Sequence, residues 1–487
     1  MINYKKILCN VMVACIATSV IGCAAKTPKA TTEGAPKLAP VELTYIFPGS
    51  YPQKDSDAVY AKLNEMTQKK INTKINYMGV AWGDFDNKVK MRFAAGEPVD
   101  LVFTSNWSND YITNVAKGNL LALDPLLEKY GKNTYTNVPK AFWDATKING
   151  KIYGSINYQI SVRNTPLKVR KTAADQVGLK MDSITKLEDL EPLLDKVVAL
   201  DKNLTTELGF MNLLFYYGYE QINATAAIKL NDASAKVVNL FKTEEYKSYI
   251  ALAKKWADKN YVKGQANIAA NGNADYIKKN TTVFFSGTWA PDTEVSESQK
   301  WFPLYAKALS DTYLTTGSVI ATMTGIGASC KNPDRAMMFL ELMNNDKDMI
   351  NTLAFGIEGK HFTKVGNAVE AIKDAGYWPD TTWAFGNTFN TYQLKGVDPT
   401  IGEQIKKMNS SAKVSPIVGF SFSPDNVKTE LANTNAVITE LSKGFDNGLL
   451  NPVSDYKKFT DRLDGAGGDK IVQEAQKQID AWKATKK

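Results

Sequence analysis

The chain has 487 residues, which is long enough for two or three domains, and 44% of them are hydrophobic and 23% charged, as is ordinary for a globular protein. The net charge of +8 comes from lysines that are scattered rather than clustered, so we expect no nucleic-acid partner. The single histidine argues against a histidine-rich metal site and against most Ser-His-Asp arrangements. We expect a protein that holds a ligand, without catalytic residues, metal or cofactor.

The first 22 residues are typical of a secretory signal peptide, because two lysines precede an apolar run that ends at Ile21. This run is too short for a membrane-spanning helix, which needs ~20 apolar residues. The motif "VIGC" resembles the lipobox of bacterial lipoproteins, and that resemblance implies that Cys23 carries lipid, including palmitate, and becomes the N-terminus. Residues 23–40 are rich in Ala, Thr, Pro and Lys, so we expect Cys23 to be followed by a flexible tether.

Cysteine count agrees with this interpretation. The chain has four cysteines, and two of them lie within the predicted signal peptide. If Cys23 carries lipid, Cys330 remains alone, and one thiol cannot form an internal disulfide. We expect Cys330 to pack as a small hydrophobic side chain.

The folded part should begin at Val41 with an alternation of strands and helices. The pattern predicts strands over 41–47, 71–78 and 99–104, with a helix over 57–70 and another within 80–95. The last of these strands is a continuous apolar run, as in a buried parallel strand. Strand, helix, strand, helix, strand is the doubly wound α/β pattern.

Each of these strands is followed by an aromatic residue in polar company. Tyr51 follows the first strand, Trp82 and Asp84 follow the second, and Asn106 and Trp107 follow the third. Ligands collect at the carboxyl ends of strands in such sheets. Aromatic faces pack on the apolar face of a sugar ring while amides and carboxylates bind its hydroxyls, so we expect these residues to contact a carbohydrate.

Two segments resemble a known family. "MRFAAGEPVDLVFTSNW" and "INGKIYGSIN" resemble the extracellular solute-binding proteins of sugar ABC transporters, although Ile156 stands where that family usually has proline. The resemblance implies a two-lobed, periplasmic-binding-protein-like α/β fold with a ligand cleft between the lobes, and a protein that is not an enzyme. It also implies that Trp289, within "TTVFFSGTWAPD", stacks on the bound sugar.

The C-terminal third resembles a narrower group. "GIEGKHF", "WAFGNTFN" and "GFSFSPDNVKTELA" are similar to the LplA/LipO-like lipoproteins of Gram-positive bacteria, which carry a distinctive C-terminal domain. This resemblance implies a monomeric protein anchored by lipid on the outer face of the cell membrane. Its partners would be an oligosaccharide and the permease subunits of an ABC importer.

We expect lobe 1 to comprise residues 41–155 plus 312–350, and lobe 2 to comprise residues 156–311 plus 351–487, including the C-terminal helical region. Hinges are expected near 155–160 and 308–318, where a ligand would select a closed state. Pro333 fits the first position of a helix whose apolar stripe includes Phe339, and a second helix is expected from Ser423 to Gly444.

Further ligand contacts are expected at the first crossing and in an aromatic-amide cluster: Asn157, Tyr158, Gln159, Arg163, Trp383, Phe385 and Asn387. Arg163 could pair with a ligand carboxylate or, as we favour, with an aspartate at the hinge. Glu358 and His361 resemble an acid-base pair, but we favour a structural loop for them.

Two other functions stay open. A lipid-anchored protein of this kind could bind a peptide or another non-sugar ligand, or could act as a sensor. It could also be an enzyme that acts on polysaccharides, which would require two carboxylates ~5–10 Å apart.

Overall fold

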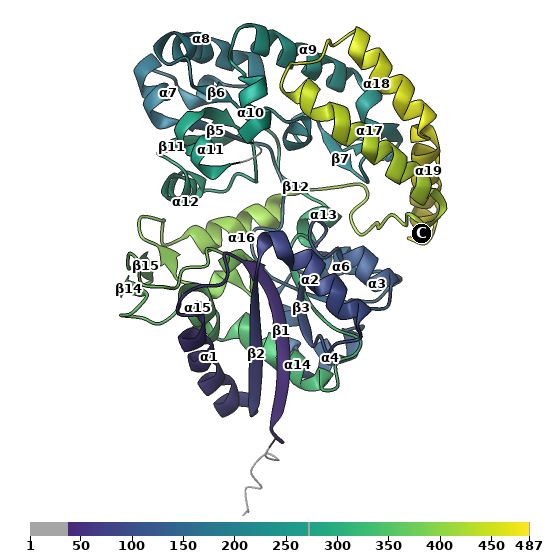
Figure 1. The fold of residues 1–487 in the computed structure, drawn as a ribbon. Coiled ribbons are helices and arrows are strands. Elements are labelled where there is room, and N and C mark those ends of the chain that lie inside the picture. The colour runs from purple at the N-terminus through teal and green to yellow at the C-terminus, as the bar shows by residue number, and fades with distance from the viewer. Residues whose placement is uncertain (1–37, 271–272, 487) are drawn as a thin grey trace, which may run out of the picture. The chain divides into compact units, whose positions relative to one another are not determined.

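The structure, a computed structural model, describes residues 38–270 and 273–486. The predicted signal peptide, Cys23 and nearly all of the predicted tether lie outside the described residues. The first sheet has the strand order β2-β1-β3-β13-β4 (Figure 1). Its strands are β1 (Val41–Gly49), β2 (Thr73–Ala81), β3 (Leu101–Thr104), β4 (Gly154–Ile156) and β13 (Met323–Ile326).

The predicted order of elements over residues 41–104 is confirmed. β1 pairs in parallel with β2 and β3, and helices α1 (Ser56–Ile71) and α2 (Trp82–Ala94) connect these strands. β13 is antiparallel to both of its neighbours, so the sheet is mixed rather than wholly parallel. The alternation in β2 buries Thr73, Ile75 and Tyr77, as period-2 patterning requires.

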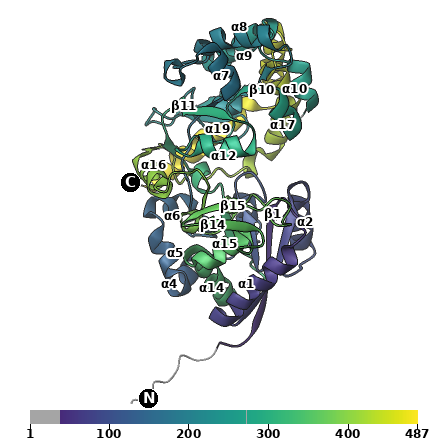
Figure 2. The same ribbon diagram turned by 90° about the vertical axis from the view of Figure 1, so that its left-hand side faces the viewer.

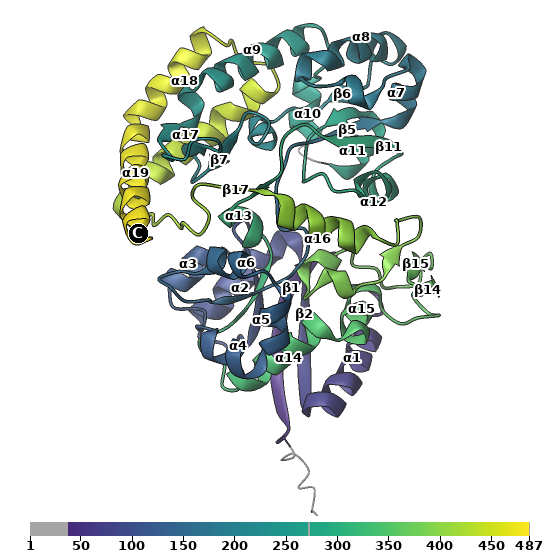
Figure 3. The same ribbon diagram turned by 180° about the vertical axis from the view of Figure 1, so that it is seen from behind.

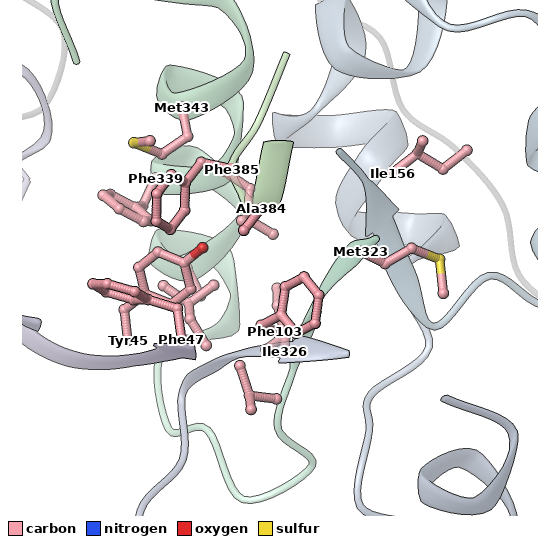
Figure 4. Packing of buried hydrophobic residues seen from close by; sticks show 14 of the residues in the cluster. Tyr45, Phe47, Phe103, Ile156, Met323, Ile326, Phe339, Met343, Ala384 and Phe385 are labelled. Atoms are coloured by element: carbon pink, nitrogen blue, oxygen red, sulfur yellow. The ribbon is translucent and has the colours of Figure 1, made fainter. Parts of the chain in front are cut away.

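Aromatic side chains dominate the core beside this sheet. Figure 4 shows Phe47 and Phe103 from the strands together with Phe339 and Phe385 from outside them. Phe339 lies on α14 (Pro333–Asn345), which begins at the predicted proline and is followed by α15 (Lys347–Phe355). The predicted apolar stripe of α14 is fully buried, which confirms the amphipathic pattern.

A second group of sheets lies further along the chain. One has the order β11-β5-β10-β6 and another the order β7-β8-β9. We call the residues packed around the first sheet the first lobe, and those packed around these two sheets the second lobe. Their strands are β5 (Pro166–Arg170), β6 (Thr205–Thr206), β7 (Tyr219–Gln221), β8 (Ala226–Lys229), β9 (Val237–Asn239), β10 (Thr281–Phe284) and β11 (Leu304–Ala308).

Helices cover the second lobe on several sides (Figure 2). The C-terminal helices pack there too, and α19 buries Ile471, Ala475 and Ile479 against Ile228 of β8. The helices of this lobe include α7 (Lys171–Val177), α8 (Glu191–Leu200), α9 (Glu244–Asp258), α10 (Gly264–Ala270), α11 (Ala274–Asn280), α12 (Thr293–Lys300), α17 (Lys428–Asp446), α18 (Ser454–Gly465) and α19 (Gly468–Ala484).

Smaller helices complete the first lobe: α3 (Tyr111–Ala116), α4 (Asp124–Tyr130), α5 (Lys132–Asn137), α6 (Lys140–Thr146) and α13 (Thr316–Val319). Two predicted boundaries are wrong. Residues 351–412 were expected in lobe 2, but Leu353 and Phe385 are buried in the core of the first lobe, where α15 packs on α1. Gly444 does not end its helix, because α17 continues to Asp446 with Leu450 packed over that glycine.

In the described ranges the chain passes between the lobes at residues 157–165, 309–322 and 412–420. In the second passage β12 (Tyr313–Leu314; Figure 1) pairs in parallel with β17 (Lys413–Val414; Figure 3) of the third. The first two passages overlap the segments predicted as hinges, whereas the third was not predicted. The third passage follows α16 (Ile401–Ser411). The stretch 351–412 that ends with this helix also contains a small sheet of β14 (Phe362–Val365), β15 (Ala368–Ala371) and β16 (Gln393–Leu394).

Cys330 packs against the first lobe's core, as predicted. Burial, and then the neighbouring Asp100, raise the pKa of its thiol to about 12, so it stays protonated at neutral pH. Among the helices that the structure describes, none is both long and apolar enough to cross a membrane.

A buried carboxyl group links the third passage to the second lobe. Glu220 on β7 is 7% exposed and accepts a hydrogen bond from the Ser415 hydroxyl, directly after β17. Burial raises the pKa of Glu220 to about 7, and the Ser415 hydrogen bond offsets part of this rise. The unfolded chain therefore releases this proton at lower pH than the folded chain does.

We expect Glu220 to make folding stability fall as pH rises from about 4.5 to about 7. Its contribution should drop by about 2 kcal/mol between pH 5 and pH 7.5, because the unfolded state ionises first. Glu220→Gln keeps a hydrogen-bond acceptor but cannot ionise, so urea unfolding should show its stability relative to wild type improving by that amount over this range. Glu370→Gln, on the exposed face of β15, is the matched control. Parallel stability profiles for Glu220→Gln and wild type would contradict this expectation.

Candidate functional site

Three tryptophans from distant parts of the chain meet at one edge of the first sheet. Trp82 begins α2 directly after β2, Trp107 follows β3, and Trp383 lies in the short helix η5 (Thr382–Ala384). The rings of Trp82 and Trp383 are nearly parallel with centroids 5.5 Å apart, and the Trp107 ring lies 5.7 Å and 6.0 Å from them. Because β2 and β3 both run parallel to β1, their carboxyl ends meet at this edge.

The tryptophan cluster is partly open to solvent and firmly held. Trp107 is 51% exposed and Trp82 38% exposed. The Trp107 indole nitrogen donates to the Ala321 carbonyl oxygen at 2.8 Å, and the Gln159 amide donates to the Trp383 carbonyl oxygen at 2.9 Å. The first bond fixes the Trp107 ring and the second fixes the Trp383 backbone, so these two residues lose little conformational entropy when a ligand packs on them.

Trp383 also lines a pocket of about 330 Å³. We call it the α12 pocket, because α12 of the second lobe forms one wall and residues 378–405 of the first lobe form most of the rest. Its aromatic lining consists of Phe355, Trp378, Trp383, Phe389 and Tyr392. Its charged lining consists of Asp292, Glu297, Lys300 and Asp380. Ring faces beside carboxylates suit a ligand with both apolar faces and hydroxyl groups.

Ion pairs organise much of the charge around the α12 pocket. The Lys168 ammonium is buried 3.2 Å from the Glu297 carboxylate, and burial lowers its pKa. Lys300 lies 4.0 Å from Asp380. Burial raises the pKa of Asp380 and of Asp292, and the negative charge of Glu297 raises both further.

Gln159, Trp82, Trp107 and Trp383 are the predicted site residues that the structure brings together. Asn106 is exposed next to this cluster in sequence, and its amide donates to the Gly317 carbonyl oxygen at 3.2 Å. Asp84 is exposed in the first turn of α2. Neither of these two lines the α12 pocket.

Five predicted ligand contacts are buried by the protein itself and present no free surface to a ligand in this structure: Tyr51, Asn157, Tyr158, Phe385 and Asn387. Tyr51 and Phe385 pack in the core against Phe47. The Asn157 amide donates to the Ala384 carbonyl oxygen at 2.8 Å, and Asn387 caps the short helix η6 (Thr388–Asn390). Asn157 thus fastens the 382–390 loop to the end of β4, and Asn387 stabilises a turn within that loop, roles that residue type alone does not reveal.

Arg163 and Trp289 lie near each other on the second-lobe side. Arg163 donates to the Thr288 hydroxyl at 2.9 Å, and no carboxylate among the described residues forms an ion pair with it, so the favoured hinge aspartate is wrong. Trp289 is half-buried, with its backbone bonded to the Asn164 side chain. Burial lowers the pKa of Arg163, although its guanidinium stays charged.

Glu358 and His361 form no acid-base pair. His361 is fully buried, accepts a hydrogen bond from the Ile357 amide at its Nδ1 and lies 3.2 Å from Asp55 at its Nε2, while Glu358 pairs with Lys364. The structural interpretation of this loop is confirmed. Within the described ranges, no group of three or more His, Cys, Asp or Glu side chains could hold a metal ion.

Sequence reasoning missed the carboxylates of the α12 pocket. Asp292 follows Trp289 in "TWAPD", and Asp380 follows Trp378 in "YWPD". Both stretches repeat the pairing of an aromatic and a carboxylate that singled out Trp82 and Asp84, so a signal was present. Asp380 adopts the left-handed conformation, φ 52°, in the turn before η5.

Two lobes joined by crossing segments, with a pocket lined from both, define a two-lobed ligand-binding protein. The chain belongs to the family of bacterial extracellular solute-binding proteins, which matches residues 52–350. Residues 416–484 match a domain of unknown function (DUF3502), in agreement with the distinctive C-terminal domain expected from the resemblance. The chain is thus a binding protein rather than an enzyme.

Individual proteins similar to this chain also carry the names of solute-binding or substrate-binding proteins. A "Carbohydrate ABC transporter substrate-binding protein" from Streptococcus pneumoniae serotype 4 (strain ATCC BAA-334 / TIGR4) is 24% identical over 442 residues, which cover 88% of this chain and 89% of the relative. The crystal structure of the N-glycan transport solute binding protein (NgtS) from Streptococcus pneumoniae matches with a TM-score of 0.82 and 23% identity, over 92% of this chain and 100% of that one. The alginate-binding protein AlgQ2 matches with a TM-score of 0.56 and 13% identity, over 91% of this chain and 98% of that one. These structures share the predicted two-lobed fold.

Proposed function

We propose that this chain captures an oligosaccharide outside the cell and delivers it to the permease subunits of an ABC importer. The observation that carries the proposal is the position of Trp383, which stacks on Trp82 and also forms a wall of the α12 pocket. A ligand that used both surfaces would extend over more than one sugar unit. The names of the relatives support the same class, since one is a carbohydrate transporter component and another was crystallised with Man5GlcNAc.

The proposal includes an anchor and a motion. The "VIGC" motif behind an apolar signal supports lipid attachment at Cys23, which would keep a monomer near its importer. Five predicted contacts do not line the pocket of this structure: Tyr51, Asp84, Asn106, Arg163 and Trp289. We keep all of them except the buried Tyr51 as proposed contacts that a closed state could add. The residues proposed to contact the ligand directly here are Trp82, Trp107, Trp383 and Gln159.

The test is binding of named glycans to lipid-free protein that spans residues 27–487. Tryptophan fluorescence and melting temperature would be followed against Man5GlcNAc, lacto-N-tetraose, cellopentaose and a set of short peptides. We expect saturable quenching by at least one glycan and stabilisation of about 2.7 kcal/mol at a hundredfold excess over Kd. The glycan should be recovered intact.

Response to a peptide with silence across the glycans would contradict the carbohydrate proposal and favour the peptide-binding alternative. Cleaved glycan would contradict simple capture.

A further inference from the structure

The charges of the α12 pocket bear on the chemical class of the ligand. Carboxylates outnumber cations in the pocket lining, where Asp292, Glu297 and Asp380 face the single lysine Lys300. The fold itself does not decide this class, because proteins of the same fold include both an N-glycan transport protein and an alginate-binding protein, and alginate is a polymer of acidic sugars. Which sugars can enter therefore depends on the side chains of this chain.

The lysines around the pocket already have carboxylate partners. Lys300 lies 4.0 Å from Asp380, and Lys168, whose side chain is 3% exposed, pairs with Glu297 at 3.2 Å and donates to the Ser286 carbonyl oxygen at 2.9 Å. Lys406, which lies over the Phe389 ring, pairs with Glu403 at 3.2 Å. An acidic ligand would have to compete with an existing carboxylate for each of these cations.

Asp292, in contrast to these lysines, has no partner of opposite charge within the described ranges. It precedes α12 and lines the pocket, and no lysine or arginine among the described residues forms an ion pair with it. An unmatched carboxylate repels a second negative charge brought into the same pocket, and partial exclusion of water strengthens this repulsion. The same carboxylate accepts hydrogen bonds from neutral hydroxyl or amide groups.

We infer that the sugar unit held in the α12 pocket is uncharged, and that a uronic or sialic acid is rejected there. This inference rests on the proposed capture of an oligosaccharide and narrows its class. Arg163 has no carboxylate partner among the described residues, but it donates to the Thr288 hydroxyl and does not line the pocket.

The experiment compares matched neutral and acidic glycans by calorimetry, with the same lipid-free protein. One pair is lacto-N-tetraose and its sialylated form, and the other is cellopentaose and a five-unit mannuronate. Man5GlcNAc serves as a further neutral probe. We expect each acidic glycan to bind about tenfold or more weakly than its neutral partner at low salt, with a smaller ratio at 0.5 M salt. Asp292→Asn should reduce this ratio, whereas Glu65→Gln, on the exposed face of α1 and outside the pocket lining, should leave it unchanged.

Two outcomes would overturn the inference. The first is an acidic glycan that binds as tightly as its neutral partner, above all if Arg163→Gln then abolishes its binding, because Arg163 would be an acid receptor. The second is a ratio of neutral to acidic glycan affinity that is the same in the wild type and in the Asp292→Asn and Asp380→Asn variants, when both variants melt at the wild-type temperature. The pocket carboxylates would then not set the selectivity. Failure of every glycan to bind is a different result, which overturns the proposed function and this inference with it.

Discussion

Replacing Trp383 by alanine should weaken glycan binding by roughly 30- to 100-fold, which corresponds to about 2–3 kcal/mol. The indole of Trp383 is the one surface that the tryptophan cluster and the α12 pocket share. Its removal therefore takes an apolar face from both parts of the proposed site. Gln159 bonds to the backbone oxygen of Trp383, so the alanine variant keeps this anchor and the loop should stay in place.

Calorimetry with the best glycan of the panel measures this effect, and the melting temperature shows whether the variant is folded. Trp383→Phe should recover part of the affinity, because a smaller ring still offers an apolar face. Trp482→Phe is the matched control, since Trp482 packs on Phe420 beside the C-terminal helices. Undiminished affinity in a folded Trp383→Ala variant would contradict the proposed site.

Replacing Phe385 by alanine should lower the free energy of unfolding by about 3–5 kcal/mol and leave glycan affinity of the folded protein unchanged. The ring is fully buried and meets Phe47 edge to face, with centroids 5.2 Å apart at 88°. Its truncation removes apolar burial and leaves a cavity in the core of the first lobe. This residue lies only two positions from Trp383, so the two variants separate packing from binding.

Urea unfolding measures the cost of Phe385→Ala, and calorimetry below the transition measures binding. Phe385→Leu should cost less than half as much, because leucine fills most of the space. If the alanine variant unfolded like wild type but bound glycan tenfold more weakly, the ring would be a ligand contact, as its place in an aromatic-amide motif suggested.

Local pattern was a good guide wherever neighbours in sequence decide the structure. Period-2 burial in β2 and the stripe of α14 follow from backbone geometry, so residues such as Ile75 and Phe339 could be placed in the core in advance. The placement of Trp82 and Trp107 at one edge also followed, since parallel strands end on the same side. The resemblance to solute-binding proteins identified the family correctly.

Local pattern failed for the 351–412 stretch. Its assignment depends on long-range packing of Leu353 and Phe385 in the first lobe, which no spacing in the sequence encodes. The third passage between the lobes was missed for the same reason, because β17 is only two residues long and its partner β12 is about a hundred residues away.

By itself, the sequence determined the order of elements over residues 41–104, the family and the aromatic residues that follow these strands, because these depend on periodicity and motif. Only the tertiary structure decided which polar and aromatic side chains are free to meet a ligand. Asn157 and Trp383 were both predicted ligand contacts. In the structure the Asn157 amide donates to the Ala384 carbonyl oxygen, whereas Trp383 lines a pocket. Burial and hydrogen-bond partners are properties of the whole fold, and a residue's type cannot reveal them.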